Sequence, residues 1–297
     1  MPSAMKSDPP SGWVTRFAPS PTGRLHKGHV ASALHARTLA APHGRYLVRL
    51  EDIDQARCTE ENVQGVLDDL AWLGLLPEPP TSIRRQSRHK TDYDAVLDTL
   101  RERRLIYPCL CSRADISHAA GTAGARAPDG SLRYPGTCRP QSGCPPIMTK
   151  GHQPAWRLDM HKALETLGGN PTWLELTGDN TFQKRTADAA SWGDVVLARR
   201  DAGLSYHLCV THDDWLQGVT LVTRGQDLEP LTVIHRVLQE LMGWPAPRYA
   251  HHPLIMGADG HKLSKSRNSP AVREDFYFEK GLSKQEIHNM LNNIILG

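Results

Sequence analysis

The feature that most constrains the fold is a proline-rich loop near the start of the chain, which separates a predicted strand from a predicted helix. Residues 19–23 (Pro-Ser-Pro-Thr-Gly) cannot be helical, because proline lacks an amide hydrogen and clashes with the preceding turn. Residues 13–18 before the loop predict a strand, and residues 28–41 after it predict a helix that stops at Pro42. Residues 46–50 predict a second strand, and this order favours a parallel sheet covered by helices.

Helices and strands continue to alternate on both sides of an irregular middle region. Apolar residues at helical spacing predict a helix that opens at Thr59 and another around Tyr93. From Cys109 to about Gly151 the chain is rich in Gly, Pro and Cys, which indicates an insertion between two halves of an α/β domain. The later elements that we expect are strands over residues 194–198, 205–210 and 219–223, a helix from Pro230 to about Met242, and a C-terminal helix with a capping box of Ser283 and Glu286.

The composition is that of a globular chain with room for a sizeable core. The sequence has 297 residues, of which 39% are hydrophobic and 23% are charged. It contains no run of about 18 apolar residues, and residues 1–12 lack the apolar centre of a signal peptide. We therefore expect a cytoplasmic protein with no membrane partner. The net charge of +3 permits a nucleic-acid partner but does not require one.

A pair of histidines follows the proline-rich loop, in the segment His26-Lys27-Gly28-His29. Ligands of open α/β sheets bind at the carboxyl ends of strands, and the unpaired amides of a helix N-terminus suit a phosphate. Gly28 lets a ligand approach the backbone closely. We interpret His26 and His29 as donors to a phosphate during adenylate formation, with surface histidines beside a turn as the alternative.

A second candidate segment lies far downstream and is rich in lysine. It reads Lys262-Leu263-Ser264-Lys265-Ser266 and follows a Gly-Ala-Asp-Gly sequence. Such a loop could close over a triphosphate and neutralise pyrophosphate as it leaves. Without the histidine segment, it would be read as an ordinary basic surface loop.

Together these two segments resemble the two signature motifs of the class I aminoacyl-tRNA synthetases. Residues 16–23 (Arg-Phe-Ala-Pro-Ser-Pro-Thr-Gly) and 49–54 (Arg-Leu-Glu-Asp-Ile-Asp) are similar to the glutamyl branch of that family. The resemblance extends from about Thr15 to Ser266 and implies a Rossmann-type α/β catalytic domain with a zinc-binding insertion and a short helical C-terminal stub. The implied division is a first Rossmann half with the ATP and glutamate site at 13–107, an inserted zinc-binding and acceptor-contacting region at 108–192, a second Rossmann half at 193–250, and the lysine-rich loop with the helical stub at 251–297.

The glutamyl branch implies a pocket for two carboxylates and one ammonium group. The positions that match its glutamate site are Arg16, Phe17, Ala18, Pro19, Ser20, Glu51, Tyr206 and Arg224. Because arginine binds carboxylates through two parallel hydrogen bonds, we expect Arg16 and Arg224 to bind the two carboxylates, in either assignment. Glu51 is expected to bind the ammonium group and Tyr206 to form a hydrogen bond, with surface ion pairs as the alternative for each charged residue.

The resemblance also implies a two-step ligase reaction that uses ATP with Mg²⁺. The α-carboxylate of glutamate attacks the α-phosphorus of ATP to give glutamyl-adenylate and pyrophosphate, and a nucleophile on RNA then displaces AMP. The catalytic residues implied are His26, His29 and Lys265. The ATP site implied is His26, Gly28, His29, Lys262, Ser264 and Lys265.

The insertion contains a candidate site for one structural zinc ion. Zinc prefers four thiolate or imidazole ligands, and Cys109, Cys111 and Cys138 supply three. Chemistry alone favours Cys144 as the fourth ligand, with His118 as a further candidate. The Tyr-x-x-x-Cys spacing of Tyr134 resembles the zinc site of the short glutamyl-queuosine tRNA(Asp) synthetases, which implies that Tyr134 is the fourth ligand.

The position at which the sequence ends also bears on the expected acceptor. A full glutamyl-tRNA synthetase continues into a large helical domain that reads the anticodon, whereas this sequence stops about 30 residues after the lysine-rich loop. The resemblance to the short family implies a monomer that activates L-glutamate without tRNA and transfers it to queuosine in the anticodon loop of tRNA(Asp). The alternatives are a truncated synthetase that charges tRNA(Glu), a small-molecule nucleotidyltransferase and an inactive RNA-binding relative.

Overall fold

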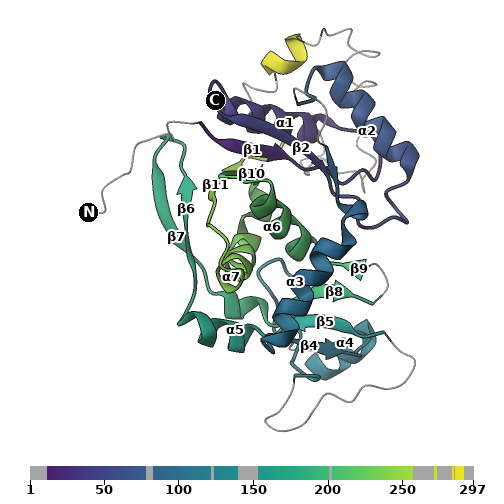
Figure 1. Cartoon of the computed structure of the whole chain (residues 1–297), viewed down its shortest axis with the longest axis vertical. Helices are drawn as coiled ribbons and strands as arrows, with labels where there is room; N and C mark the ends of the chain where they lie inside the picture. Colours follow the sequence, from purple (N-terminus) through teal and green to yellow (C-terminus); the bar gives the residue numbers. More distant parts are fainter. Residues whose placement is uncertain are drawn as a thin grey trace.

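The proline-rich loop at residues 19–23 joins a parallel strand to a helix that packs against the sheet (Figure 1). In the computed structural model, β1 (Val14–Phe17) is followed by α1 (Lys27–Ala40) and β2 (Arg45–Leu50). β1 and β2 pair in parallel, with Arg16 opposite Leu47. The predicted strand, loop, helix and strand are therefore confirmed.

The structure describes residues 12–77, 83–121, 124–139, 153–200, 203–256, 271–272, 283 and 285–290. After β2, the elements of the first part are α2 (Glu60–Leu73), β3 (Arg84–Arg85), the 3₁₀ turn η2 (Gln86–Arg88), α3 (Lys90–Glu102), β4 (Ile106–Cys109) and α4 (Arg113–Ala120). The middle elements are β5 (Ala155–Leu158), α5 (Met160–Leu167), β6 (Thr172–Leu176), β7 (Phe182–Thr186), η3 (Ala189–Trp192), β8 (Val196–Arg199) and β9 (Gly203–Leu204). The last are α6 (Tyr206–Leu216), β10 (Leu221–Gly225), η4 (Gln226–Leu231), α7 (Thr232–Met242) and β11 (Arg248–His252).

The described strands form three hydrogen-bonded groups, in the orders β1-β2-β3, β10-β11-β6-β7 and β4-β5-β8-β9. The first group is parallel, and so are the β10–β11 and β11–β6 pairs. β10 begins beside β1, because the Thr220 amide donates to the Val14 carbonyl oxygen at 3.0 Å and the Val14 amide donates to the Thr220 hydroxyl at 2.9 Å. The carboxyl ends of β1, β2 and β10 therefore meet, and Figure 1 shows the three strands near one another in the upper part of the molecule.

The strand predicted over residues 205–210 is wrong, since α6 occupies this segment. Ser205 caps the helix, with its hydroxyl accepting a hydrogen bond from the Leu208 amide at 3.4 Å. Residues 208–214 are all buried, although the last four of them are polar or charged, so this part of the helix has no exposed face that would give the sequence a helical period. A short apolar run that is buried all round cannot be told from a buried strand by its pattern.

The other later elements lie close to their predicted places. The helix expected from Pro230 is confirmed, but Pro230 lies in the 3₁₀ turn η4 and α7 begins at Thr232. The capping box at the C-terminal helix is also confirmed, because the Ser283 amide donates to Glu286 Oε2 at 2.8 Å and the Glu286 amide donates to the Ser283 hydroxyl at 3.3 Å. Among the helices that the structure describes, none has both the length and the apolar character needed to cross a bilayer.

Candidate functional site

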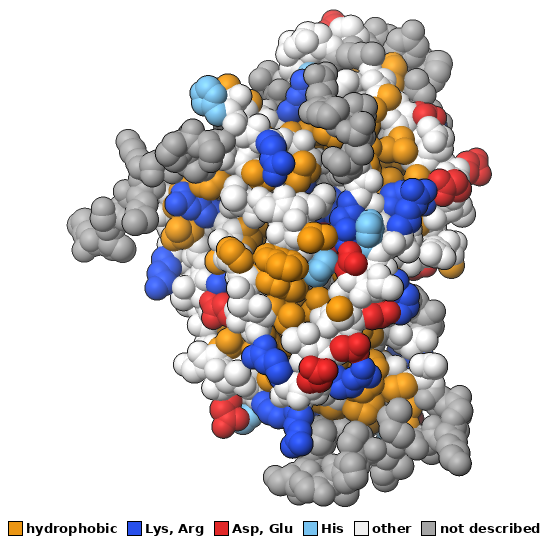
Figure 2. All heavy atoms as spheres, viewed as in Figure 1, with side chains coloured by type: hydrophobic (Ala, Val, Ile, Leu, Met, Phe, Trp, Pro, Cys, Tyr) orange, Lys and Arg blue, Asp and Glu red, His pale blue; other side chains and the backbone are white. Residues whose placement is uncertain are grey.

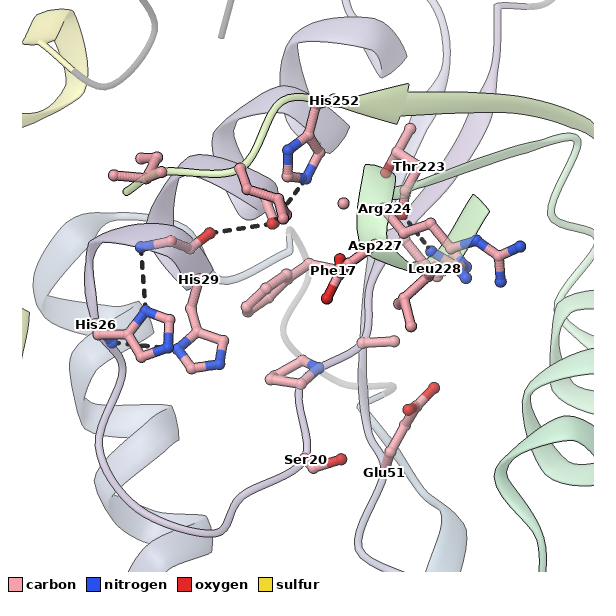
Figure 3. Close-up of a pocket in the computed structure, with 18 of the residues that line it drawn as sticks. Phe17, Ser20, His26, His29, Glu51, Thr223, Arg224, Asp227, Leu228 and His252 are labelled. Atoms are coloured by element: carbon pink, nitrogen blue, oxygen red, sulfur yellow. Dashed lines mark hydrogen bonds between the residues drawn. The ribbon is translucent and has the colours of Figure 1, made fainter. Parts of the chain in front are cut away.

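A pocket of about 480 Å³ lies where the carboxyl ends of β1, β2 and β10 meet the N-terminus of α1. In Figure 3, His26 and His29 lie on one side of this pocket, and Glu51 and Arg224 lie on the other. The structure thus brings together the histidine segment and the predicted glutamate-binding residues. The predicted residues that line the pocket are Arg16, Phe17, Ala18, Pro19, Ser20, His26, Gly28, His29, Glu51, Tyr206 and Arg224.

The two histidines of the first motif are held in the same tautomer by backbone amides. The Gly28 amide donates to His26 Nδ1 at 3.1 Å, and the His26 amide donates to His29 Nδ1 at 3.2 Å. A nitrogen that accepts a hydrogen bond carries no hydrogen, so each neutral ring carries its hydrogen on Nε2. The ring centroids lie 3.7 Å apart, which places two Nε2–H donors side by side at the start of α1.

Gly28 is required by the position of the His26 ring. A Cβ atom at residue 28 would lie 3.0 Å from Cε1 and 3.2 Å from Nδ1 of His26. Any larger side chain would therefore push the His26 ring away from the Gly28 amide. The glycine predicted for close ligand approach also allows the histidine to cap its own helix.

Arg16 is fixed by a buried carboxylate and by a backbone carbonyl. Its Nε donates to Asp214 Oδ1 at 2.9 Å, and its Nη1 donates to the Thr223 carbonyl oxygen at 2.7 Å. Arg49 donates to the same Asp214 oxygen at 2.8 Å. Burial opposes ionisation of Asp214, but the two arginines outweigh it and hold the pKa of Asp214 below its usual value.

Glu51 is a buried carboxylate whose charge is incompletely satisfied. Its Oε1 lies 3.6 Å from Arg49 Nη2 and has no hydrogen-bond partner among the described residues. Burial raises the pKa of Glu51 to about 7, although Arg49 and Arg16 favour its ionised form. Because the Glu51 side chain also lines the pocket, its ionised form would attract a cationic group that entered there.

Arg224 is a buried arginine held by neutral groups. It is 5% exposed and contacts Thr232, His235 and His251 through its guanidinium nitrogens. Within the part of the chain that the structure describes, no carboxylate lies at ion-pair distance from it. Burial raises the pKa of Tyr206, which also lines the pocket, while Arg224 acts in the opposite direction. Arg224 is therefore positioned to receive an anion.

Several pocket residues escaped the sequence analysis. One of them is His252, which lines the pocket and whose Nε2 lies 2.8 Å from the Ser32 hydroxyl. Asp214, which binds Arg16, and Arg49, which donates to the same carboxylate, were not predicted either, although neither of them lines the pocket. The available signals were paired acids in a helix and a charge inside an apolar strand. Lys262, Ser264 and Lys265 lie outside the described residues, so their predicted roles stay predictions.

A cluster of sulfur atoms lies apart from the pocket, at β4 and the chain after α4. The Sγ atoms of Cys109, Cys111 and Cys138 lie within 4.8 Å of one another. The Tyr134 hydroxyl lies 3.4 Å from Cys109 Sγ and 3.6 Å from Cys111 Sγ. Three thiols so close together could hold a metal ion such as zinc. Cys144 lies outside the described residues, and His118 is an exposed residue of α4 that is not in the cluster.

The surface charge is mixed rather than dominated by one sign. Figure 2 shows Lys and Arg side chains interspersed with Asp and Glu side chains over the described part of one face. This agrees with the small net charge of +3. A nucleic-acid partner of such a surface would be held through a local footprint rather than through a broad basic field.

Comparisons with known proteins agree on one family. Residues 13–296 match the family described as tRNA synthetases class I (E and Q), catalytic domain. A Glutamyl-Q tRNA(Asp) synthetase of Rhodobacter capsulatus is 43% identical over 281 residues, which cover 94% of this chain and 99% of that protein. A glutamate–tRNA ligase of Bordetella parapertussis is 35% identical over 283 residues, which cover 93% of this chain and 55% of the ligase.

The solved structures share the fold. A glutamate tRNA ligase from Elizabethkingia meningosepticum, in complex with its amino acid, aligns with a TM-score of 0.64 at 24% identity. The alignment covers 89% of this chain and 53% of that ligase, so this chain spans about half the length of the ligase. The expected class I catalytic fold is therefore confirmed.

Removal of the charge of Asp214 is expected to destabilise the fold strongly. Asp214→Asn leaves Arg16 and Arg49 buried without their carboxylate, and breaking a buried ion pair costs about 3–5 kcal/mol. Urea unfolding should show a loss of that order. Asp94→Asn, which removes the exposed pair with Lys90, is the matched control and should change the free energy of unfolding by less than about 1 kcal/mol. Equal losses in the two variants would contradict this assignment.

Proposed function

The chain belongs to the class I tRNA synthetases of the glutamyl and glutaminyl type, and on this premise we propose that it activates L-glutamate with ATP and transfers it to a tRNA. The finer proposal is that activation needs no tRNA and that the acceptor is queuosine in tRNA(Asp). The names of the similar proteins support this acceptor, since the Rhodobacter capsulatus relative is a Glutamyl-Q tRNA(Asp) synthetase over nearly its whole length.

One observation carries the proposal, namely the distribution of charge in the pocket. Arg224 is buried with neutral partners, and Glu51 has a buried oxygen without a hydrogen bond. Buried charges must be paired, so the pocket is complementary to a ligand that carries both a carboxylate and an ammonium group. An α-amino acid has this pair of groups, and a second carboxylate makes glutamate a better match for a site that also contains Arg16.

The other side of the pocket suits the phosphates of ATP. His26 and His29 present Nε2–H donors next to the N-terminus of α1, whose first turn contains no acidic residue. The partial positive charge of that terminus and the two donors favour negative charge at the same place. We assign the two histidines to the α-phosphate, where charge develops as the bond to the incoming carboxylate forms.

The first step follows from this placement. The α-carboxylate of glutamate forms a bond to the α-phosphorus of ATP, the bond from that phosphorus to the bridging oxygen breaks, and pyrophosphate leaves. Mg²⁺ bound to ATP would supply neutralisation of the phosphates. Arg224 and Glu51 keep the amino acid in place, and the histidines donate to the α-phosphate oxygens. The roles of Lys262, Ser264 and Lys265 in holding pyrophosphate are part of the proposal.

Pyrophosphate exchange tests the two steps in sequence. We expect the protein to exchange pyrophosphate into ATP when L-glutamate is present and no tRNA is added. Absence of exchange without tRNA would overturn the tRNA-independent step. Transfer of labelled glutamate is then measured with tRNA(Asp) that contains queuosine, tRNA(Asp) that lacks it, and tRNA(Glu). Labelling of the first alone is expected, whereas labelling of tRNA(Glu) would favour a truncated glutamyl-tRNA synthetase.

The ionisation of Glu51 predicts how activation depends on pH. Its pKa is raised to about 7, and only its ionised form pairs with the ammonium group of glutamate. Below about pH 7 the protonated form prevails, so kcat/KM for glutamate should fall about tenfold per pH unit as the pH is lowered further. Glu51→Gln, which is neutral at every pH, should have a low kcat/KM that lacks this fall. A wild-type profile that stays flat between about pH 6 and about pH 8 would contradict the role of Glu51.

The sulfur cluster is proposed to hold one structural zinc ion. Cys109, Cys111, Cys138 and Tyr134 would be its ligands, in agreement with the four donor atoms gathered there. Tyr134 is buried, and the guanidinium of Arg157 lies 3.8 Å from the centre of its ring. Burial raises the pKa of the Tyr134 hydroxyl, so the loss of its proton would depend on the positive charge of the bound ion. The ion would tie β4 to the segment around Cys138.

Metal analysis of purified variants tests this ligand set. The wild-type protein should contain about one zinc ion per chain, and Cys138→Ser should lose it. Tyr134→Phe keeps the ring and removes the fourth donor, so it should release zinc to a chelator faster than the wild type. Cys144→Ala should behave like the wild type. If Cys144→Ala lost zinc while Tyr134→Phe kept it, Cys144 rather than Tyr134 would be the fourth ligand.

A further inference from the structure

Three neighbours fix the guanidinium of Arg224 on the side away from the pocket. Nε donates to His251 Nε2 at 3.1 Å, Nη1 lies 3.0 Å from His235 Nδ1, and Nη2 donates to the Thr232 hydroxyl at 2.7 Å. His251 belongs to β11, whereas His235 and Thr232 belong to α7, of which Thr232 is the first residue. The three contacts engage three of the five N–H groups of the arginine. The remaining N–H groups are available to Tyr206 and to a ligand.

The arginine dictates the tautomer of both histidines. Arginine is always protonated and can only donate hydrogen bonds, so His251 Nε2 and His235 Nδ1 must accept. Each neutral ring then carries its hydrogen on the other nitrogen. Protonation of either ring would remove the acceptor and place a second cation beside Arg224.

The opposite nitrogens of the two rings meet partners that suit these tautomers. His251 Nδ1 lies 2.6 Å from Glu175 Oε1, which accepts its hydrogen. His235 Nε2 lies 3.2 Å from His207 Nδ1, which can accept likewise. Burial lowers the pKa of His235 well below its usual value and that of His207 to about 4, and Arg224 adds to both shifts. The rings are thus locked from both sides.

A neutral acceptor orients an arginine without offsetting its positive charge, whereas a carboxylate does both. Asp214 orients Arg16 and also offsets part of its charge, because the same carboxylate pairs with Arg49 as well. His235 and His251 orient Arg224 without neutralising it, and the nearest carboxylate in this chain of contacts, Glu175, lies one ring away. An arginine held in this way keeps its attraction for an anionic ligand.

We propose that His251 and His235 are positioning residues, which hold Arg224 through their unprotonated nitrogens so that it is aimed at a carboxylate of the ligand while keeping its charge. Glu175 and His207 complete the arrangement by fixing the two tautomers. The inference rests on the proposed function, in which Arg224 receives a carboxylate of glutamate.

A crossed set of substitutions tests the proposal. The amide of glutamine reaches about as far as Nε2 of histidine, and that of asparagine about as far as Nδ1. His251→Gln and His235→Asn should therefore keep the acceptor and stay within about threefold of the wild-type KM for glutamate. His251→Asn and His235→Gln remove the acceptor for Arg224 and should raise the KM for glutamate about tenfold or more, because each loses a hydrogen bond to a charged group. The KM for ATP should not change in any of the four.

The controls separate this role from general packing. His161→Gln, at an exposed position of α5, should leave both KM values unchanged. The inference would be overturned if Gln and Asn at the same site raised the KM for glutamate equally. It would also be overturned if the rise in KM followed the decrease in melting temperature of each variant rather than the position of its amide group. A wild-type protein that showed no glutamate-dependent exchange would overturn the proposed function itself, which is a different result.

Discussion

Two adjacent buried carboxylates of α6, Asp213 and Asp214, hold the site together. Asp214 accepts from Arg16 and Arg49 on β1 and β2. Asp213 accepts from Arg84 Nε at 2.8 Å, and from Gln86 and the Tyr93 hydroxyl on the elements that follow β2. A helix from late in the chain is thereby tied to strands from its beginning. Because such ions are costly to bury unless all partners are present, this network specifies one arrangement of the strand ends.

The network also divides the arginines of the pocket into two kinds. Arg16 is 4% exposed and has a carboxylate partner at 2.9 Å, which it shares with Arg49, so its charge is partly offset within the protein. Arg224 is equally buried, but its partners are a hydroxyl and two imidazoles. The difference bears on which arginine attracts a carboxylate more strongly. Arg16 can still donate hydrogen bonds to a carboxylate through its remaining N–H groups, whereas no carboxylate of the described residues offsets the charge of Arg224.

The sequence predicted those parts of the fold and of the site that are determined by residues close together along the chain. The loop before α1, the helix after it and the strand that ends at Leu50, next to Glu51, follow from proline geometry, helix ends and apolar runs. The helix α6 was mistaken for a strand because burial on every side erases its period. Asp214 was missed because its meaning depends on two arginines that are 165 and 198 residues away in sequence. No local pattern contains such a pairing.

The histidines show why residue type alone could not assign these roles. His26 and His29 accept backbone hydrogen bonds through Nδ1 and so direct Nε2–H groups outward, toward the negative charge of a phosphate. His251 accepts through Nε2 and directs its hydrogen inward to Glu175. The same neutral ring therefore serves as a donor on one side of the pocket and as an acceptor on the other. Its role is set by whichever partner can only donate, a backbone amide in one case and an arginine in the other. A carboxylate in place of His251 would bind Arg224 more tightly, but it would neutralise the charge that the ligand needs.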